Sequence, residues 1–241
     1  MTKKIVNSSG VTWKYGYSNK NQLTSVDKWS EDPDTEGTAV LQSSADYQYD
    51  ALGNRNQKTV DADGSGGGSA VVTRFALEGW NPAKANPIGT ENFDIWAVLD
   101  GSSSLTSRNL DGDNVDQHLG YITGGNAYWY LTDHLGSTRK VLDNAATVKD
   151  ALVYDAFGNI TSETDSSFRG LYAWTGREFD VESQLQNNRA RYYDPPTARW
   201  ISQDPLGFDA GDSNLYRYVK NKAQILKDPS GNKAQAVGIQ V

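Results

Sequence analysis

The sequence of 241 residues contains no cysteine and only two histidines, His118 and His134. Without a thiol, the protein can form no disulfide, thiolate zinc site or cysteine nucleophile. The histidines stand in no HExxH or other zinc-binding spacing, so we expect neither a metal nor a cofactor. His134 follows Asp133 at an expected turn, where a hydrogen-bonding role at a strand end explains it better than a ligand role.

Positive charge and long apolar runs are also scarce. Thirty acidic residues outnumber 23 basic ones, which gives a formal net charge of −7. Nucleic-acid binding needs a basic face that displaces counterions from phosphates, so no nucleic-acid partner is expected. No segment is long and apolar enough to span a bilayer, and the charged start of the chain lacks the apolar run of a signal peptide.

Aromatic residues, in contrast, are abundant. Thirteen Tyr, seven Trp and six Phe suit a pleated surface, because flat rings fill the space between strands while the Tyr hydroxyl stays near water. Exposed rows of such rings also stack on sugars, so a carbohydrate-binding surface is one alternative; the other is that the rings fill the interior of the sheet. With either use of the rings, the composition predicts an all-β protein.

Similar units recur along the chain, each with an aromatic or apolar pair before a short polar turn and then alternating residues. They are YGYSNKNQLTSV (15–26), YQYDALGNRNQKTV (47–60), WYLTDHLGSTRKVLD (129–143) and LVYDAFGNITSET (152–164). Alternation with Gly or Asn at the reversal is typical of a β-hairpin. Successive hairpins predict an antiparallel meander that curves into a wall and leaves open edges, through which the protein could self-associate.

Three segments interrupt this pattern and are expected to be loops. Residues 30–37 are acidic and suit a loop with one helical turn, residues 61–69 suit a flexible hairpin tip, and residues 80–90 contain two Asn-Pro pairs. Residues 93–110 then resume a strand, an Asp-Gly turn and a second strand, so the hairpin series continues past the loops.

The segment 187–231 has the most distinctive composition. It contains three Asp-Pro pairs, at Asp194, Asp204 and Asp228, and the last two continue as Asp-Pro-x-Gly among Arg- and Tyr-rich stretches. Such motifs form good turns, because Pro fixes φ and Gly accepts a positive φ. Two carboxylates near an arginine are also what an aspartyl-type active site needs, and a return strand over residues 213–219 would bring the second and third Asp together.

This segment resembles the RHS repeat-associated core domain of bacterial Rhs and YD-repeat proteins and of Tc toxin C-components. The resemblance extends upstream through YWYLTDHLGSTRKVLD (128–143), VYDAFGNITSE (153–163) and YAWTGREFD (172–180). It implies YD-repeat hairpins over residues 1–120, an RHS core over 121–231 and a short tail over 232–241. The fold implied is a curved β-shell wall with a C-terminal plug.

The resemblance also implies a function. In that family the core closes a shell around a toxin, and in several members it cleaves its own chain as an aspartyl-type peptidase. The family's catalytic residues fall on Arg191, Asp204 and Asp228, and the cleavage junction on Gly231, Asn232 and Lys233, with the bond after Asn232 cut. The implied partner is the rest of a larger Rhs shell or toxin polypeptide, secreted or at the cell surface.

The sequence departs from the family at three positions. Ala198 replaces a turn Gly, Ala223 stands where a Pro is usual, and Asn232 stands where self-cleaving members carry Leu. A shallow pocket that recognises Leu would lose about 1–3 kcal/mol of transition-state binding with Asn. The nine residues from Lys233 to Val241 are too few for a toxin domain. We therefore expect the plug to fold and cleavage to be weak or lost; the alternative is a structural or carbohydrate-binding cell-surface module.

A calcium loop is a further candidate. Asp111, Asp113 and Asp116 alternate with small residues in DGDNVD, but the twelve-residue EF-hand frame and its closing Glu are missing. A polar loop before a strand over residues 115–122 is the preferred interpretation.

Overall fold

The computed structural model describes residues 1–35, 37–78 and 93–237. Across these residues the regular structure is almost entirely antiparallel β-sheet, as the composition predicts. A first sheet contains β1 (Lys3–Ile5), β2 (Thr12–Tyr17), β3 (Leu23–Trp29), β4 (Leu41–Tyr49), β5 (Arg55–Asp61), β6 (Val71–Leu77), β7 (Ile95–Asp100), β8 (Leu105–Asp111), β9 (His118–Thr123), β10 (Asn126–Thr132), β11 (Thr138–Asp143), β12 (Val148–Tyr154) and β13 (Ile160–Glu163).

Two smaller sheets follow in the C-terminal part of the chain. They contain β14 (Glu178–Asp180), β15 (Leu185–Asn188), β16 (Arg191–Asp194) and β17 (Arg199–Trp200), and then β18 (Leu226–Lys227) and β19 (Gln235–Ala236). Short 3-10 helices connect them: η2 (Ser166–Phe168), η3 (Trp174–Gly176), η4 (Pro195–Thr197), η5 (Gly207–Ala210) and η6 (Val219–Asn221). We call the 13-stranded sheet the wall, and residues 164–237 the plug.

The wall is the meander that the repeated hairpins predict. Each strand pairs antiparallel with the next along the chain, from β1 to β13, so β1 and β13 are its edges. The four repeated units form the β2–β3, β4–β5, β10–β11 and β12–β13 hairpins. Strand order continues across residue 120, and the change to the plug follows Glu163.

An aspartate closes many of the wall's turns. In each case its Oδ1 accepts backbone N–H groups from the second and fourth following residues, at 2.8–3.0 Å. The aspartates are Asp50, Asp100, Asp133, Asp143 and Asp155. The Asp of the Tyr-Asp repeat therefore supplies an acceptor for backbone N–H groups that a tight reversal leaves unsatisfied, which is why it follows the strand.

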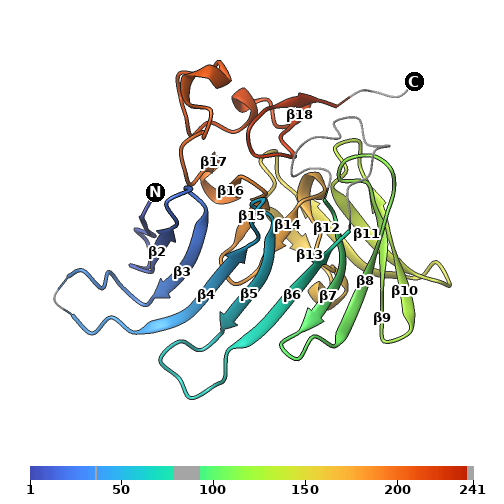
Figure 1. Cartoon of the computed structure of the whole chain (residues 1–241), viewed down its shortest axis with the longest axis horizontal. Helices are drawn as coiled ribbons and strands as arrows, with labels where there is room; N and C mark the ends of the chain where they lie inside the picture. Colours follow the sequence, from blue (N-terminus) through green and yellow to red (C-terminus); the bar gives the residue numbers. More distant parts are fainter. Residues whose placement is uncertain (36, 79–92, 238–241) are drawn as a thin grey trace.

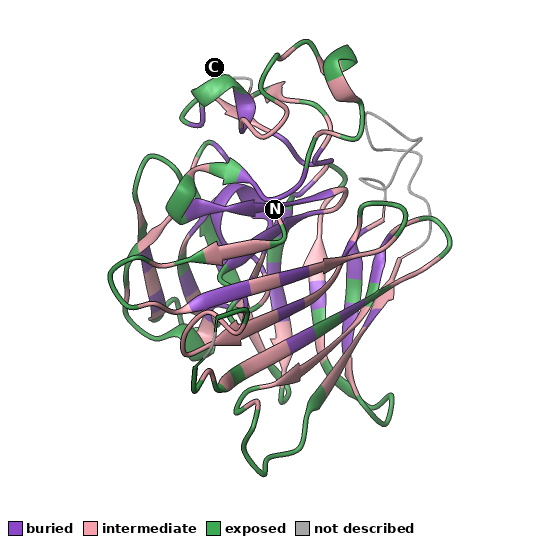
Figure 2. Cartoon of the chain, turned by 90° about the vertical axis from the view of Figure 1, so that its left-hand side faces the viewer, coloured by how far each residue is buried: buried purple, intermediate pink, exposed green. Residues whose placement is uncertain are grey.

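The wall curves around the plug (Figure 1). Figure 2 shows that the most buried strands, in purple, lie where the inner four-stranded sheet meets the wall. One core cluster joins wall strands to the plug: Trp13, Tyr15, Leu23, Val26, Ala45 and Tyr47 pack with Leu185, Tyr192 and Ile201. A second cluster lies mainly within the plug and contains Trp174, Tyr193, Trp200, Tyr218, Val219 and Ala223. Tyr and Trp rings thus make up much of these two clusters, as the alternative in which the rings fill the interior expects.

Some local predictions need correction. The return strand expected over residues 213–219 is not a strand; this segment turns, and it contacts β17 through the isolated bridge between Arg199 and Arg217. The segment turns because the side chains of Asp212 and Asn214 accept hydrogen bonds from backbone N–H groups two residues ahead, and such bonds favour turns over strands. The expected loop at 61–69 joins β5 to β6, and the loop at 80–90 lies outside the described residues.

The acidic loop at residues 30–37 contains turns and bends at its described positions, without the expected helical turn. Its carboxylates pair with lysines of the first two strands: Lys3 Nζ lies 2.7 Å from Asp32 Oδ2, and Lys14 Nζ lies 2.7 Å from Asp34 Oδ1. The loop is thereby attached to the β1 side of the wall.

Candidate active site

Arg191 is the centre of the candidate site. It begins β16 opposite Asn188, directly after a tight turn in which Arg189 has a φ of 62°. Its side chain is only 3% exposed, and its guanidinium carbon lies 4.2 Å from the centre of the Trp200 ring on the next strand. The stacked indole holds the guanidinium flat while leaving its N–H edge free for other partners.

Both predicted carboxylates lie on the same nitrogen of Arg191. Its Nη2 is 2.9 Å from Asp204 Oδ2 and 3.5 Å from Asp228 Oδ2. Asp204 is positioned by its own turn, because its Oδ1 accepts the Leu206 N–H at 3.0 Å and its backbone N–H donates to the Leu215 carbonyl at 3.0 Å. The three residues predicted to be catalytic are therefore adjacent, with a guanidinium between the two acids.

Asp228 is the more deeply buried acid, at 3% side-chain exposure. Its Oδ1 accepts the Ser230 hydroxyl at 3.2 Å and the backbone N–H groups of Asn232 and Lys233 at 3.2 and 3.1 Å. Burial raises the pKa of its carboxyl above the ordinary aspartate value, although Arg191 and these hydrogen bonds oppose the shift. Asp228 is thus the acid better suited to retain a proton.

The Asp-Pro-Ser-Gly backbone lies against the β15–β16 turn. Arg191 Nε donates to the Gly231 carbonyl, Asn188 Nδ2 donates to the Asp228 carbonyl at 2.7 Å, and Arg189 Nη1 donates to the Pro229 carbonyl at 2.7 Å. Gly231 has a φ of 73°, and a Cβ there would lie 2.3 Å from the Asn188 carbonyl oxygen. Only glycine fits this approach, so the motif fixes the chain just before the predicted junction.

The predicted junction lies beside the two acids. The amide nitrogen of Lys233, which belongs to the predicted scissile bond, is 3.1 Å from Asp228 Oδ1. A cavity of about 220 Å³ adjoins it, lined among others by Arg191, Trp200, Asp204, Asp228, Asn232 and Lys233. The cavity gives space for water beside a peptide bond, an acid and a guanidinium, which is the minimum that hydrolysis of a peptide needs.

Sequence reasoning missed the supporting residues of this site. Ser230 and Asn188 hold the acid and its backbone, and Trp200 supports the guanidinium. The available signal was weak: a Ser inside the Asp-Pro-x-Gly motif and a Trp in the strand after the Arg do not by themselves indicate contact.

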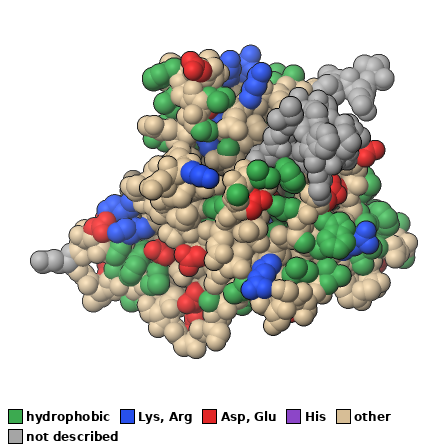
Figure 3. Space-filling model, in the orientation of Figure 1, with side chains coloured by type: hydrophobic (Ala, Val, Ile, Leu, Met, Phe, Trp, Pro, Cys, Tyr) green, Lys and Arg blue, Asp and Glu red, His purple; other side chains and the backbone are tan. Residues whose placement is uncertain are grey.

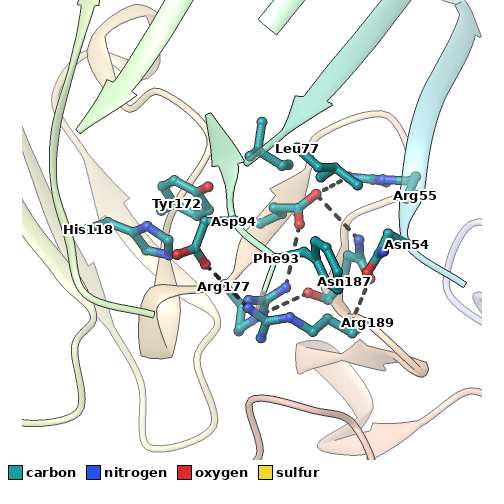
Figure 4. A pocket seen from close by; sticks show the side chains of 12 residues that line it. Asn54, Arg55, Leu77, Phe93, Asp94, His118, Tyr172, Arg177, Asn187 and Arg189 are labelled. Carbon is teal, nitrogen blue, oxygen red and sulfur yellow. Dashed lines mark hydrogen bonds and ion pairs between the residues drawn. The ribbon is translucent and has the colours of Figure 1, made fainter. Parts of the chain in front are cut away.

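A second polar cluster, also missed, joins the wall to the plug. Arg55 of β5 lies 2.5 Å from both Glu178 Oε2 and Asp180 Oδ2 of β14, and its side chain is 2% exposed. Figure 4 shows Arg177 and Arg189 close together on the other side of a small cavity, which at about 30 Å³ has room for about one water molecule. The cavity is too small for a substrate, and the charged side chains around it pair with one another. This cluster therefore serves to hold the wall and the plug together.

The residues weighed as metal ligands have other partners. Asp116 Oδ1 lies 2.7 Å from Arg177 Nη1 and 2.9 Å from Arg189 Nη2. Burial alone would raise the pKa of Asp116, but the two arginines outweigh it and hold the pKa well below the ordinary value. Asp111 Oδ1 lies 2.5 Å from His118 Nδ1. Asp111 ends β8, and residues 112–117 form a polar loop before β9, as preferred.

His134 lies at the turn between β10 and β11, and its Nε2 is 3.0 Å from the Gln224 carbonyl oxygen. Within residues 1–35, 37–78 and 93–237, no group of three or more His, Asp or Glu side chains is arranged to hold a metal. In the same part of the chain, no helix has the length and apolar character needed to cross a membrane.

Known proteins match this architecture. The family model described as Teneurin YD-shell matches residues 114–224. The tRNA nuclease WapA of Bacillus subtilis is 28% identical over 223 residues, which cover 90% of this chain and 8% of that protein. Toxin protein Tse5 of Pseudomonas aeruginosa is 34% identical over 103 residues, 43% of this chain and 8% of Tse5.

Among solved structures, the crystal structure of TcdB2-TccC3 matches with a TM-score of 0.65 at 19% identity. The match covers 92% of this chain and 10% of that one, which supports the shared fold. The chain spans about 8% of the length of the WapA relatives. The family-model match over residues 114–224 and the shared fold support an RHS and YD-repeat core domain in this chain.

Proposed function

We propose that this chain forms the wall and plug segment of a larger YD-shell that encloses a toxin. The support is architectural: a curved 13-stranded sheet, whose edge strands β1 and β13 each pair on one side only among the described residues, packs around a plug, and its match in TcdB2-TccC3 is 10% of a far longer chain. Open edges are where further strands of the same shell would add. The toxin named in the relative Tse5 supports the same class of cargo, and export or surface display of the whole shell fits that role.

We further propose that the plug hydrolyses its own chain after Asn232. One observation carries this proposal: Lys233 N–H contacts Asp228 Oδ1 while the neighbouring Asp204 and Asp228 share one nitrogen of Arg191. Asp204 accepts a proton from a water molecule, whose oxygen attacks the carbonyl carbon of Asn232. The buried Asp228 delivers its proton to the Lys233 nitrogen as the carbon–nitrogen bond breaks.

Arg191 stabilises the proposed reaction in two ways. Its Nη2 holds both acids at the junction, and its Nε binds the Gly231 carbonyl one residue before the bond to be cut. A fixed cation near a developing oxyanion lowers the barrier, because it needs no reorganisation during the reaction. Asn232 in the place of the family's Leu weakens substrate recognition, so we expect slow cleavage.

Intact mass of the purified chain tests cleavage directly. The full-length 26.4 kDa species should lose the segment Lys233–Val241 during incubation, and Asp204→Asn should abolish this loss. Asp212→Asn is the matched control, since Asp212 lines the same cavity but pairs with Arg217 instead. A parent chain that keeps its full mass through prolonged incubation would contradict self-cleavage, and equal cleavage in the Asp204 variant would contradict the assigned roles.

Carbohydrate binding is the second candidate, favoured by two surface tryptophans. Trp96 and Trp129 are each 41% exposed, whereas twelve other Tyr, Trp and Phe rings of the described residues are buried. Figure 3 shows hydrophobic side chains in separate patches among polar atoms on one face of the molecule. If these rings bind sugars, tryptophan fluorescence should shift in titrations with cell-surface oligosaccharides, and Trp129→Ala should reduce the shift. An unchanged spectrum across a panel of glycans would rule this function out.

A further inference from the structure

The chain just after the predicted junction is held in a strand of its own. β19 pairs antiparallel with β18, with Leu226 opposite Ala236 and Lys227 opposite Gln235. Val237 extends the pairing, because its N–H donates to the Ile225 carbonyl at 3.2 Å. β18 ends at the residue before Asp228, so the strand that holds this segment is continuous with a proposed catalytic acid.

The segment has two further attachments on the same side of the junction. Ala234 packs against the aromatic cluster of Trp174, Tyr193, Trp200 and Tyr218. Lys233 N–H donates to Asp228 Oδ1. Backbone pairing along one strand edge, with a small side chain in an apolar niche, is how proteins bind extended peptides by strand addition.

The other side of the junction has separate anchors. Arg191 and Arg189 bind the carbonyls of Gly231 and Pro229. Apart from the Lys233 N–H, whose nitrogen becomes an amine on cleavage, these contacts use atoms outside the bond between Asn232 and Lys233. Breaking that bond therefore leaves the β18–β19 pairing and the hydrogen bonds to the Gly231 and Pro229 carbonyls in place.

We propose that β18 and the aromatic cluster form a peptide-binding site for residues 233–237, which keeps the cut product attached to the plug. The inference rests on the proposed self-cleavage, and it makes cleavage and release two separate steps. The ligand class is an extended peptide with a small residue at its second position. Sequence-independent backbone bonds supply most of its affinity.

The direction of the bound segment supports this role. Val237 lines a cavity of about 780 Å³ between β18 and wall strands, together with His118, Tyr130, His134 and Lys227. The described end of the segment therefore lies beside the wall. A product bound in this way is oriented as well as retained.

Two readouts on the full chain test the site. In the uncut Asp204→Asn chain, hydrogen exchange should show the Val237 amide protected by about tenfold or more over a free peptide. After cleavage of the parent chain, native mass spectrometry should show the segment Lys233–Val241 still bound, while denaturing conditions separate it.

A pair of proline substitutions gives a matched comparison. Val237→Pro removes the donor to Ile225, so the product should dissociate roughly fivefold faster. N–H groups alternate in direction along a strand, so the Ala236 N–H points away from β18, and Ala236→Pro should have a smaller effect. An unprotected Val237 amide, or a product lost equally fast from parent and Val237→Pro chains, would overturn the site. A protected amide without cleavage would contradict the proposed reaction alone.

Discussion

Ala198 occupies a backbone conformation that glycine adopts far more readily than alanine. Its φ is 55° and its ψ is 37°, in the left-handed region, at the end of η4. The family that the chain resembles usually has Gly at this turn, and the left-handed backbone explains that preference.

We expect Ala198→Gly to raise the free energy of unfolding by about 0.5–1 kcal/mol, because glycine adopts this conformation without the Cβ penalty. Urea unfolding at neutral pH measures the change. Ala151→Gly, inside β12, is a control with the opposite expected sign. It should lower the free energy of unfolding, since glycine in a strand loses more conformational entropy on folding. A loss of stability in Ala198→Gly would contradict the strain argument.

Asp228 should make stability depend on pH in a particular direction. Burial raises the pKa of its carboxyl, so the folded state keeps this proton at pH values where the unfolded chain has lost it. Stability therefore falls as pH rises from the ordinary aspartate pKa through the raised value. Asp228→Asn does not titrate, so the free energy of unfolding of the variant minus that of the parent should increase over this window.

Urea unfolding in steps between about pH 4 and about pH 7 would measure this difference. A difference that stays constant or decreases with pH would show that hydrogen bonds and Arg191 outweigh burial. Because Asp228→Asn also leaves Arg191 without one partner, the slope with pH is the informative quantity.

At the level of single elements, the hairpin turns depend on one carboxylate each. Asp143 Oδ1 accepts the N–H groups of Ala145 and Thr147, both at 2.9 Å, in the turn between β11 and β12. We expect Asp143→Ala to lower the free energy of unfolding by about 1–2 kcal/mol, because two turn donors lose their acceptor.

Asp143→Asn should recover much of this loss, since its amide oxygen can still accept. Asp113→Ala, at an exposed position with the same change of residue type, is the control and should alter stability little. Equal effects of Asp143→Ala and Asp113→Ala in urea unfolding would show that strand pairing alone determines the turn.

At the scale of the whole molecule, Arg55 connects the wall to the plug. It forms buried ion pairs with Glu178 and Asp180 and donates to the Tyr192 hydroxyl at 3.0 Å. Arg55→Met keeps the volume but leaves two buried carboxylates without this partner. We expect a loss of about 3–5 kcal/mol in the free energy of unfolding, together with faster proteolysis of the plug.

Lys14→Met is the comparison, because it breaks the exposed ion pair with Asp34 on the surface of the wall. It should change stability little, since water replaces such a pair readily. If Arg55→Met and Lys14→Met unfold at the same urea concentration, the buried ion pairs of Arg55 do not stabilise the packing of the plug against the wall.

The sequence predicted the wall well because its determinants are local. Alternating residues and the turn residues of each repeat specify a hairpin within about fifteen residues, as in the unit at 47–60. The strand expected at 213–219 was wrong because Asp212 and Asn214 accept hydrogen bonds from backbone N–H groups two residues ahead, and these local turns override the alternation of the residues after them. The wall–plug network lay beyond prediction, since Arg55 and Asp180 are separated by 125 positions.

By itself, then, the sequence determined an all-β hairpin meander and, through family resemblance, the three candidate residues. Only the tertiary structure decided their arrangement. Arg191 lies between Asp204 and Asp228 because β16, the Asp204 turn and the glycine-dependent approach of Gly231 converge on one side of the plug. Each of these contacts joins segments far apart in the chain. A local sequence pattern does not show which distant segments will meet.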